Sequence, residues 1–300
     1  MSTSFKPNNI AFTKTRYLFF WFILFNIAFA TLYGLFRELI PGLPSFEDPL
    51  VNHIIYTCSF VSICYYLAQE LRQSKLNPQY LWGNLRPRYS WVSLLGLAIA
   101  FLLFSIGAAL VSFHCLSIIA PEFHESFMDT LSEQESRESV LPIISKCLQV
   151  INYVIVAPIT EEFVFRGVLL HRLATKWNLP VGIWVSSIIF GLLHPNPIGI
   201  AAVGFAWALL YIKTRTLVVP IVAHGINNAF AVMGEFSSDF IENNTTLVDS
   251  SSEATDNEWI FGLVCLAIAL PFVLRFVWRY FPSKDKSLPY FANQAEVAID

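Results

Sequence analysis

The stretch EEFVFR, residues 161 to 166, places two adjacent glutamates and an arginine inside an apolar run. Two further stretches hold polar residues in apolar surroundings, FGLLH at 190–194 and HGINN at 224–228. An ionisable residue within a membrane span is costly, and by default it indicates a functional site. Carboxylate and imidazole groups take up and release protons in enzymes, so this set of residues suits hydrolytic chemistry.

Helical spacing separates the two glutamates. Glu162 and Arg166 lie four residues apart, so they share a helix face and can form an ion pair. Such a pair is expected to be structural. Glu161 is rotated by about 100° from its neighbour and is left without that partner. Asn152, nine residues earlier in the same apolar run, is expected to hydrogen bond to a neighbouring helix.

The two histidine stretches can contribute to one site with Glu161. His224 and Asn228 lie four residues apart and can aim at one point, while Phe190 precedes His194 by one turn and can wall the same site. Counted at about 1.5 Å per residue from the nearest basic residues, Glu161 and the two histidines overlap in depth. A single intramembrane histidine more often bonds a neighbouring helix. Three clusters at one depth favour a site.

The composition indicates a polytopic membrane protein. Of the 300 residues, 55% are hydrophobic and 14% are charged, whereas soluble domains carry about 25% charged residues. The net charge of -3 gives no reason to expect a nucleic-acid partner. The five cysteines are scattered and form no CxxC pair, which argues against a disulfide framework or a cysteine metal site.

Hydropathy predicts an all-α bundle of about eight transmembrane helices that forms a single domain over residues 1–300. The apolar run that begins at Tyr17 continues past the signal-peptide-like AFA at 28–30, so an uncleaved first span is favoured over a cleaved leader. The expected spans are 17–37, 51–71, 91–119, 147–173, 180–195, 198–213, 216–234 and 258–281.

Charge in the connections predicts the orientation. Acidic residues dominate segments 120–138 and 235–258, while basic residues dominate the alternate connections. Because Lys and Arg favour the cytoplasmic side, eight spans place both termini in the cytoplasm. The membrane would be the plasma or inner membrane in a bacterium, or the endoplasmic reticulum in a eukaryote. The basic residues are Lys6, Lys14, Arg16, Arg72, Lys75, Arg86, Arg88, Arg172, Lys176, Lys213, Arg215, Arg275, Arg279, Lys284 and Lys286.

The residues leave two hydrolytic chemistries open. Amide hydrolysis needs a base for water and hydrogen-bond donors for the oxyanion. Glu161, His194 and His224 also make up the Glu-His-His ligand type of catalytic zinc sites, although the HExxH signature is absent. We favour metal-free water activation, with zinc as the alternative. A serine nucleophile has less support, because Ser186 and Ser187 lie about two turns before His194.

The three motifs together resemble those of the CPBP intramembrane proteases, also called the Abi family, the CAAX-prenyl-protease-like group related to the Rce1-type endopeptidase. Its pattern is EExxxR, FxxxH, then HxxxN or HxxxD, and the resemblance covers about residues 145–232. It implies an eight-helix fold with this stretch as its catalytic core, and peptide-bond hydrolysis in a membrane cavity. The matching residues are Glu161, Glu162 and Arg166, then Phe190 and His194, then His224 and Asn228.

The resemblance also implies roles. Glu161 and His194 would activate a water, and His224 with Asn228 would stabilise the oxyanion. Glu162 and Arg166 would support the helix, and the partner would be a membrane-bound peptide or protein substrate within the lipid bilayer. A transporter or proton relay, and a non-catalytic bacteriocin-immunity protein of the same fold, remain the alternatives.

Overall fold

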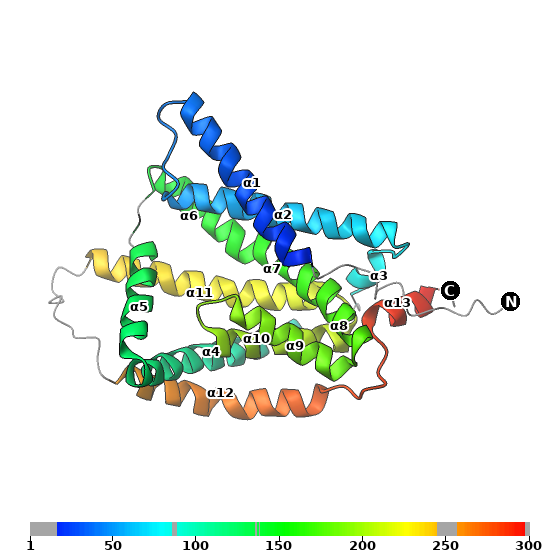
Figure 1. Cartoon of the computed structure of the whole chain (residues 1–300). Helices are drawn as coiled ribbons and strands as arrows, with labels where there is room; N and C mark the ends of the chain where they lie inside the picture. The colour runs from blue at the N-terminus through cyan, green and yellow to red at the C-terminus, as the bar shows by residue number, and fades with distance from the viewer. Residues whose placement is uncertain (1–16, 86–88, 136, 138, 245–256, 298–300) are drawn as a thin grey trace.

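The computed structural model describes residues 17–85, 89–135, 137, 139–244 and 257–297, and every element in those ranges is a helix. The all-α prediction is therefore confirmed for the described chain (Figure 1). Lys6, Lys14, Arg16, Arg86 and Arg88, which entered the orientation argument, lie outside the described residues. The elements are α1 (Leu18–Leu39), α2 (Pro49–Gln73), α3 (Gln79–Trp82), α4 (Trp91–Ile119), α5 (Pro121–Glu135), α6 (Pro142–Ile151), η3 (Asn152–Val156), α7 (Ala157–Glu162), η4 (Phe163–Leu169), α8 (Leu170–Lys176), α9 (Leu179–Leu192), α10 (Pro197–Thr214), α11 (Val218–Asn244), α12 (Glu258–Tyr280) and α13 (Pro289–Val297).

Among the described residues, six helical stretches are long and apolar enough to cross a membrane, which makes the chain a multi-pass membrane protein. The predicted total of eight spans is not confirmed. Helix α9 has 14 residues, or about 21 Å at 1.5 Å per residue, which is short of a hydrocarbon core of about 30 Å. Helix α11 has 27 residues, but His224, Asn227 and Asn228 make it less apolar. The six are Phe20–Leu39, Pro49–Gln73, Trp91–Ile119, Pro142–Lys176, Pro197–Thr214 and Glu258–Tyr280.

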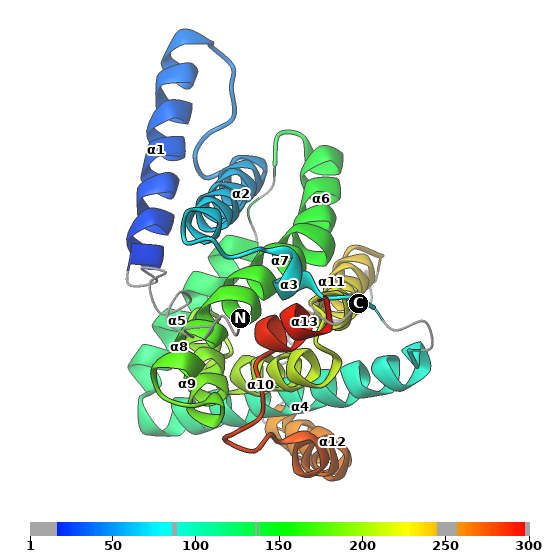
Figure 2. The ribbon, with the colours of Figure 1, turned by 90° about the vertical axis from the view of Figure 1, so that its right-hand side faces the viewer.

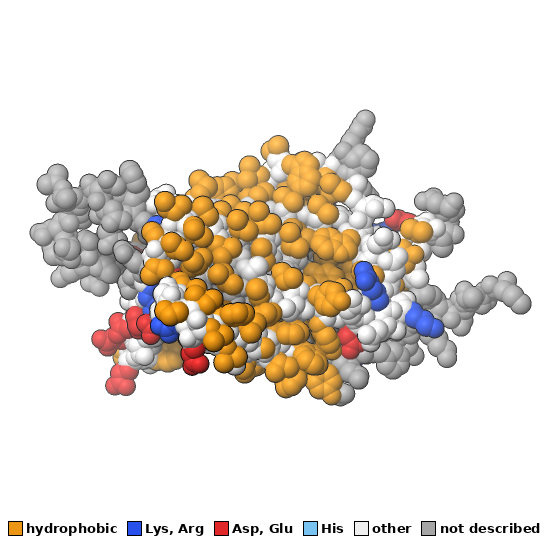
Figure 3. All heavy atoms as spheres, turned by 90° about the horizontal axis from the view of Figure 1, so that it is seen from above, with side chains coloured by type: hydrophobic (Ala, Val, Ile, Leu, Met, Phe, Trp, Pro, Cys, Tyr) orange, Lys and Arg blue, Asp and Glu red, His pale blue; other side chains and the backbone are white. Residues whose placement is uncertain are grey.

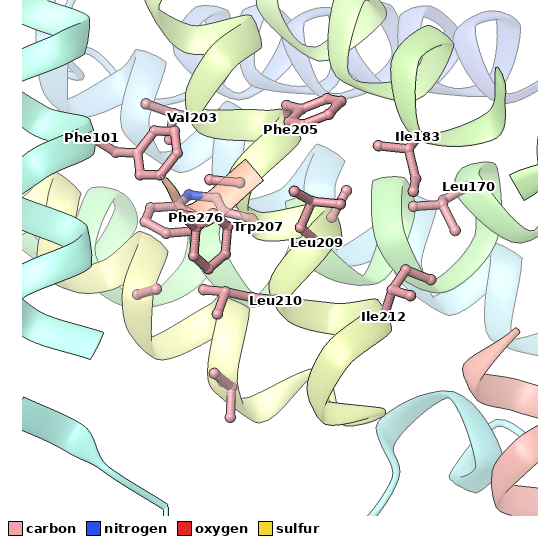
Figure 4. Close-up of a cluster of buried hydrophobic side chains, with 14 of the residues drawn as sticks. Phe101, Leu170, Ile183, Val203, Phe205, Trp207, Leu209, Leu210, Ile212 and Phe276 are labelled. Carbon is pink, nitrogen blue, oxygen red and sulfur yellow. The ribbon is translucent and has the colours of Figure 1, made fainter. Parts of the chain in front are cut away.

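Helix α10 forms the centre of the bundle. Its Trp207 and Leu209 are fully buried, and Figure 4 shows them among side chains from α4, α9 and α12. The Phe101 ring of α4 lies 6.0 Å from the Trp207 ring and 6.0 Å from the Phe276 ring of α12. Interlocking aromatic side chains of three helices therefore fix the position of α10, which lies between the elements that carry the site.

Helices α4 and α12 approach closely because small residues meet between them. A Cβ atom added at Gly107 would lie 2.6 Å from the Gly262 carbonyl oxygen, and one added at Gly262 would lie 2.9 Å from Leu110 Cβ. Contacts of this kind are typical of membrane helix pairs, where close van der Waals packing stabilises association. The pair forms one outer edge of the bundle (Figure 1).

The basic connections gather at one end of the molecule. Arg215 Nη1 pairs with Glu296 Oε1 at 2.7 Å, and Asn293 Nδ2 donates to the carbonyl oxygens of Tyr80 and Arg215, each at 2.8 Å. These contacts join the connection after α10 to α13 and α3. The acidic helix α5 lies at the opposite end (Figure 1), and a broad hydrophobic belt separates the charged ends (Figure 3). The belt has the position expected for lipid contact.

Helix α1 lies at the periphery, beside α2 (Figure 2). Aromatic side chains join the two helices. The Trp21 ring lies 5.1 Å from Tyr66, and the Phe22 ring lies 5.0 Å from Phe60 in an edge-to-face arrangement. Helix α2 in turn contacts the helical run that carries the glutamates. These contacts therefore connect α1 to the site through α2.

Candidate active site

The two glutamates lie on a short helix, α7, between two π-helical segments, η3 and η4. Pro158 in α7 has no N–H to donate to the Val154 carbonyl oxygen, so the regular α-helical bonding is interrupted there. A wider π-helical turn shifts the direction of the side chains that follow, and such turns are frequent at functional sites. The fourth predicted span is thus one continuous helical run, Pro142–Lys176, with a changed register at Glu161 and Glu162.

Gly225 lets α11 approach this irregular segment. A Cβ atom at position 225 would lie 2.9 Å from the Val154 carbonyl oxygen, which is closer than side chains tolerate. Val154 O is the acceptor that Pro158 leaves without its usual donor. Because His224 is the adjacent residue, this close approach also brings its imidazole to the glutamates.

Glu162 and Arg166 form the ion pair that their spacing predicts. Arg166 Nη1 lies 2.8 Å from Glu162 Oε1, and both side chains are almost completely buried. The guanidinium has further partners: its Nη2 donates to the Gly204 carbonyl oxygen at 2.9 Å, and its Cζ lies 4.4 Å from the centre of the Phe190 ring. A Cβ atom at Gly204 would lie 2.9 Å from Phe190 Cδ1, so glycine is needed for this contact. The pair therefore ties α10 and α9 to the fourth span.

His224 lies against both glutamates; the sequence placed it near Glu161 but did not predict its contact with Glu162. Its Nδ1 is 3.0 Å from Glu162 Oε1, and its Nε2 is 3.9 Å from Glu161 Oε2. His224 is 5% exposed and Glu161 is 7% exposed, so the arrangement is shielded from solvent. Since an ionised carboxylate only accepts hydrogen bonds, Nδ1 carries the proton of the 3.0 Å bond. Glu162 is thus a partner of His224 as well as of Arg166.

His194 lies just beyond the end of α9 rather than inside a span. Helix α9 ends at Leu192, and Pro195 disfavours helical geometry at the residue before it. His194 Nδ1 lies 2.7 Å from the Phe190 carbonyl oxygen, so this nitrogen donates and Nε2 is left for other partners. The Phe190 ring lies 4.8 Å from the His194 ring and 5.9 Å from the His224 ring. The Phe190 ring therefore lies close to both histidine rings, and its role as a wall of the site stays a prediction.

Asn196 fixes the turn that carries His194. Its Nδ2 donates to the Ser105 carbonyl oxygen of α4 at 2.9 Å, and its Oδ1 accepts from Gly199 N at 3.1 Å, which caps α10. The position of His194 thus depends on packing against α4.

Asn228 reaches the fourth span. Its Nδ2 donates to the Tyr153 carbonyl oxygen at 2.8 Å, and it follows His224 by one helical turn. Nearby, Asn152 makes the interhelical bonds that were expected: its Nδ2 donates to the His53 carbonyl oxygen at 3.0 Å, and its Oδ1 accepts from Thr57 Oγ1 at 2.6 Å. These bonds connect α2 and α11 to the π-helical segment η3.

Tyr56 of α2 is a neighbour of Glu161 that sequence reasoning missed. Its hydroxyl donates to Glu161 Oε1 at 3.1 Å. Tyr56 belongs to none of the three motifs, and its hydroxyl is one of several in this span, beside those of Thr57 and Tyr66, so it gives no signal of its own. The two oxygens of Glu161 therefore face different helices, α2 on one side and α11 on the other.

A zinc site would need Glu161, His194 and His224 to lie around one point. Within the described ranges, no group of three or more His, Cys, Asp and Glu side chains is arranged to hold a metal ion. Glu161 and His224 are adjacent, and no contact joins His194 to either of them in the described structure. As they lie in the described structure, these three side chains therefore do not form a metal site.

Comparison with known proteins matches the region that holds this site. Residues 143–230 match the family described as type II CAAX prenyl endopeptidase Rce1-like. The candidate membrane peptidase YdiL of Bacillus subtilis strain 168 is 36% identical over 105 residues, which cover 34% of this chain and 43% of that protein. The membrane-embedded CAAX protease MroQ of Staphylococcus aureus strain USA300 is 37% identical over 89 residues, covering 26% of this chain and 36% of that protein.

The matches are partial. The chain spans less than half the length of either of these curated relatives. No solved structure matches the chain. The matched range includes all seven residues of the three motifs and excludes Tyr56.

Proposed function

Because residues 143–230 match the Rce1-like CAAX prenyl endopeptidase family, we propose that this chain is an intramembrane endopeptidase that hydrolyses a peptide bond with water activated by Glu161. The observation that carries the proposal is the buried Glu161 carboxylate facing His224 Nε2 at 3.9 Å. A base and a hydrogen-bond donor at one shielded place are what amide hydrolysis requires. The match to a protease family supports the reaction class, and the geometry supports the roles of the residues.

In the proposed reaction, Glu161 takes a proton from water while the water oxygen bonds to the carbonyl carbon of the substrate. The carbonyl oxygen becomes negatively charged, and His224 with Asn228 stabilises it. The carbon–nitrogen bond then breaks, and Glu161 returns its proton to the leaving amine. His194 orients the attacking water through Nε2, because its Nδ1 donates to the Phe190 carbonyl oxygen.

The contact between His224 and Glu162 limits how His224 acts. Its Nδ1 proton is used in the bond to Glu162, so Nε2 can donate to an oxyanion only in the imidazolium form. The same contact supports the second role of Glu162, which is to keep the donor in place.

Zinc-assisted hydrolysis is the second candidate chemistry, and one observation favours it. Both histidines use Nδ1 toward an oxygen acceptor, which leaves Nε2 available, and metal-ligating histidines are commonly oriented in this way. Glu161, His194 and His224 would be the ligands only after the side chains move, because in the described residues they are not arranged to hold a metal ion. The two chemistries differ in the expected effect of chelation.

We propose a membrane-bound peptide or protein as the substrate, with both termini of the chain in the cytoplasm. The acidic helix α5 and the basic end formed around Arg215 lie at opposite ends of the bundle, which supports this orientation. Whether the substrate is prenylated depends on the cell that makes the chain.

The test is the replacement Glu161→Gln, which removes the base and keeps the shape. Membrane proteins that accumulate uncut in cells with this variant identify the substrate, and a synthetic peptide covering the cut provides the assay. Glu70→Gln, a carboxylate change on another helix, α2, serves as the control. We expect Glu161→Gln to abolish cleavage without loss of thermal stability. Unchanged cleavage would overturn the proposal, and a transport or immunity function would then explain the buried charges.

A further inference from the structure

One of the described side chains that contact Glu161, the candidate base, lies outside residues 143–230, the region that matches the family. Tyr56 of α2 donates its hydroxyl proton to Glu161 Oε1 at 3.1 Å. The other carboxylate oxygen, Oε2, faces His224 at 3.9 Å. The two oxygens are therefore distinguished by their surroundings, and only one of them faces the residues that would hold the oxyanion.

We propose that Tyr56 is a positioning residue for the reaction: its phenol holds Glu161 through Oε1 so that Oε2 stays directed toward His224. This inference rests on the proposed function. A glutamate side chain can rotate about three bonds, and rotation would turn the oxygen that faces His224 away from the water. A small displacement of a reacting group lowers turnover strongly.

The ring of Tyr56 is itself held in place. It lies 4.5 Å from the Phe60 ring, one turn further along α2, and Phe60 in turn lies 5.0 Å from the Phe22 ring of α1. Aromatic pairs at these separations contribute beyond the area that they bury. These ring contacts therefore fix the orientation of the Tyr56 phenol.

The neighbouring residue fixes α2 against the fourth span. Thr57 Oγ1 donates to Asn152 Oδ1 at 2.6 Å, and Asn152 Nδ2 donates to the His53 carbonyl oxygen at 3.0 Å. In a membrane such bonds between helices replace absent water partners. Together they hold the Tyr56 hydroxyl at a constant distance from α7, so the contact to Glu161 is built into the packing of α2.

Tyr66 provides a matched control for the experiment. It lies on the same helix, and its hydroxyl also donates to a glutamate oxygen, Glu70 Oε1, at 3.2 Å. This contact is away from the site. Tyr56→Phe and Tyr66→Phe remove the same atom from the same helix, so a difference between them reports on the position of Glu161.

The experiment compares both variants with the unmodified protein in detergent, using the synthetic peptide that covers the identified cut. We expect Tyr56→Phe to lower kcat by roughly 10-fold to 100-fold with KM and thermal stability unchanged. Tyr66→Phe should leave kcat unchanged. Equal kcat values for Tyr56→Phe and the unmodified protein would overturn the inference, and so would a loss of kcat that is matched by a loss of thermal stability.

A second measurement needs no substrate and separates the two proposals. The infrared carboxyl band of Glu161 is assigned as the band that is lost in Glu161→Gln. We expect this band to move in Tyr56→Phe and to keep its position in Tyr66→Phe. A band that stays in place in Tyr56→Phe would overturn the inference. A moved band in a protein without any Glu161-dependent cleavage would overturn the proposed function alone, because the contact would then exist without proteolysis.

Discussion

His224 and Glu162 are joined by a hydrogen bond of 3.0 Å between Nδ1 and Oε1, although 62 residues separate them in the chain. The same Glu162 oxygen lies 2.8 Å from Arg166 Nη1. One buried carboxylate oxygen therefore links the candidate oxyanion donor on α11 to the arginine that holds α10. The structural pair and the candidate site share an atom, so a change in one is expected to affect the other.

The first prediction concerns Arg166. Arg166→Ala leaves Glu162 as a buried charge without its cation, so we expect a loss of stability of roughly 3–5 kcal/mol. Thermal unfolding in detergent measures it. The control is Arg137→Ala, which breaks an ion pair of the same i,i+4 spacing at 3.0 Å with Glu133 on the surface. Exposed pairs contribute about 0–1 kcal/mol, so the control should unfold almost as the unmodified protein does.

Glu162→Gln should behave differently from Arg166→Ala because it also removes the acceptor of His224. We expect lower thermal stability together with a fall in kcat that persists at temperatures where the variant is fully folded. Full activity of folded Glu162→Gln protein would mean that the His224 contact has no part in turnover.

The second prediction concerns Asn228, whose amide bonds the Tyr153 carbonyl oxygen in the described structure. If Asn228 donates to the oxyanion during the reaction, Asn228→Ala should lower kcat by about 10²–10³ with little change in KM. Kinetics on the synthetic peptide decide this. A higher KM with an unchanged kcat would assign Asn228 to substrate binding instead.

Sequence reasoning succeeded where the relationship was local. The spacing of Glu162 and Arg166 determines their contact, because both lie on one helix, and the ion pair at 2.8 Å confirms it. The expectation for Asn152 was also confirmed, because a polar side chain in a span needs a partner on another helix. Spacing therefore predicted the ion pair, whereas polarity predicted only that Asn152 bonds another helix, without naming its partner.

The sequence did not predict which residues pair between helices. The bond from His224 to Glu162 and the bond from Tyr56 to Glu161 depend on how α11 and α2 pack, which no spacing along one chain segment reveals. The fifth span was overestimated for a related reason. Its apolar run continues to 193, but the helix ends at Leu192, and His194 belongs to the turn that Asn196 fixes to α4.

The third prediction is the orientation of the chain. On a background without native cysteines, we expect a cysteine at Ser126 in α5 to react with a membrane-impermeant reagent from the outside. A cysteine at Ser283, after α12, should react only when the cytoplasmic side is opened. Both positions are exposed. Labelling of Ser126 only from the cytoplasm would reverse the orientation.

The fourth prediction concerns metal dependence. We expect activity to persist after exhaustive chelation, because the proposed water activation uses Glu161 and His194 without a metal. Metal content by mass spectrometry is measured beside activity before and after treatment. Stoichiometric zinc whose removal and return switch activity off and on would make Glu161, His194 and His224 metal ligands.

The fifth prediction concerns Gly225, which allows α11 to approach the fourth span. A Cβ atom there would lie 2.9 Å from the Val154 carbonyl oxygen, which is main chain and cannot move aside easily. Gly225→Ala should therefore push α11 outward and draw His224 away from both glutamates. We expect a loss of thermal stability and a large fall in kcat together.

Gly234 on the same helix is the matched control for this change. A Cβ atom at Gly234 would meet nothing within 4 Å, so Gly234→Ala changes only the preference of the residue for a helix. That preference favours alanine by roughly 0.8–1 kcal/mol, so the control should be as stable as the unmodified protein or slightly more stable, with full activity. If Gly225→Ala also keeps full activity, His224 does not depend on the close approach of α11, and the packing argument for the site is wrong.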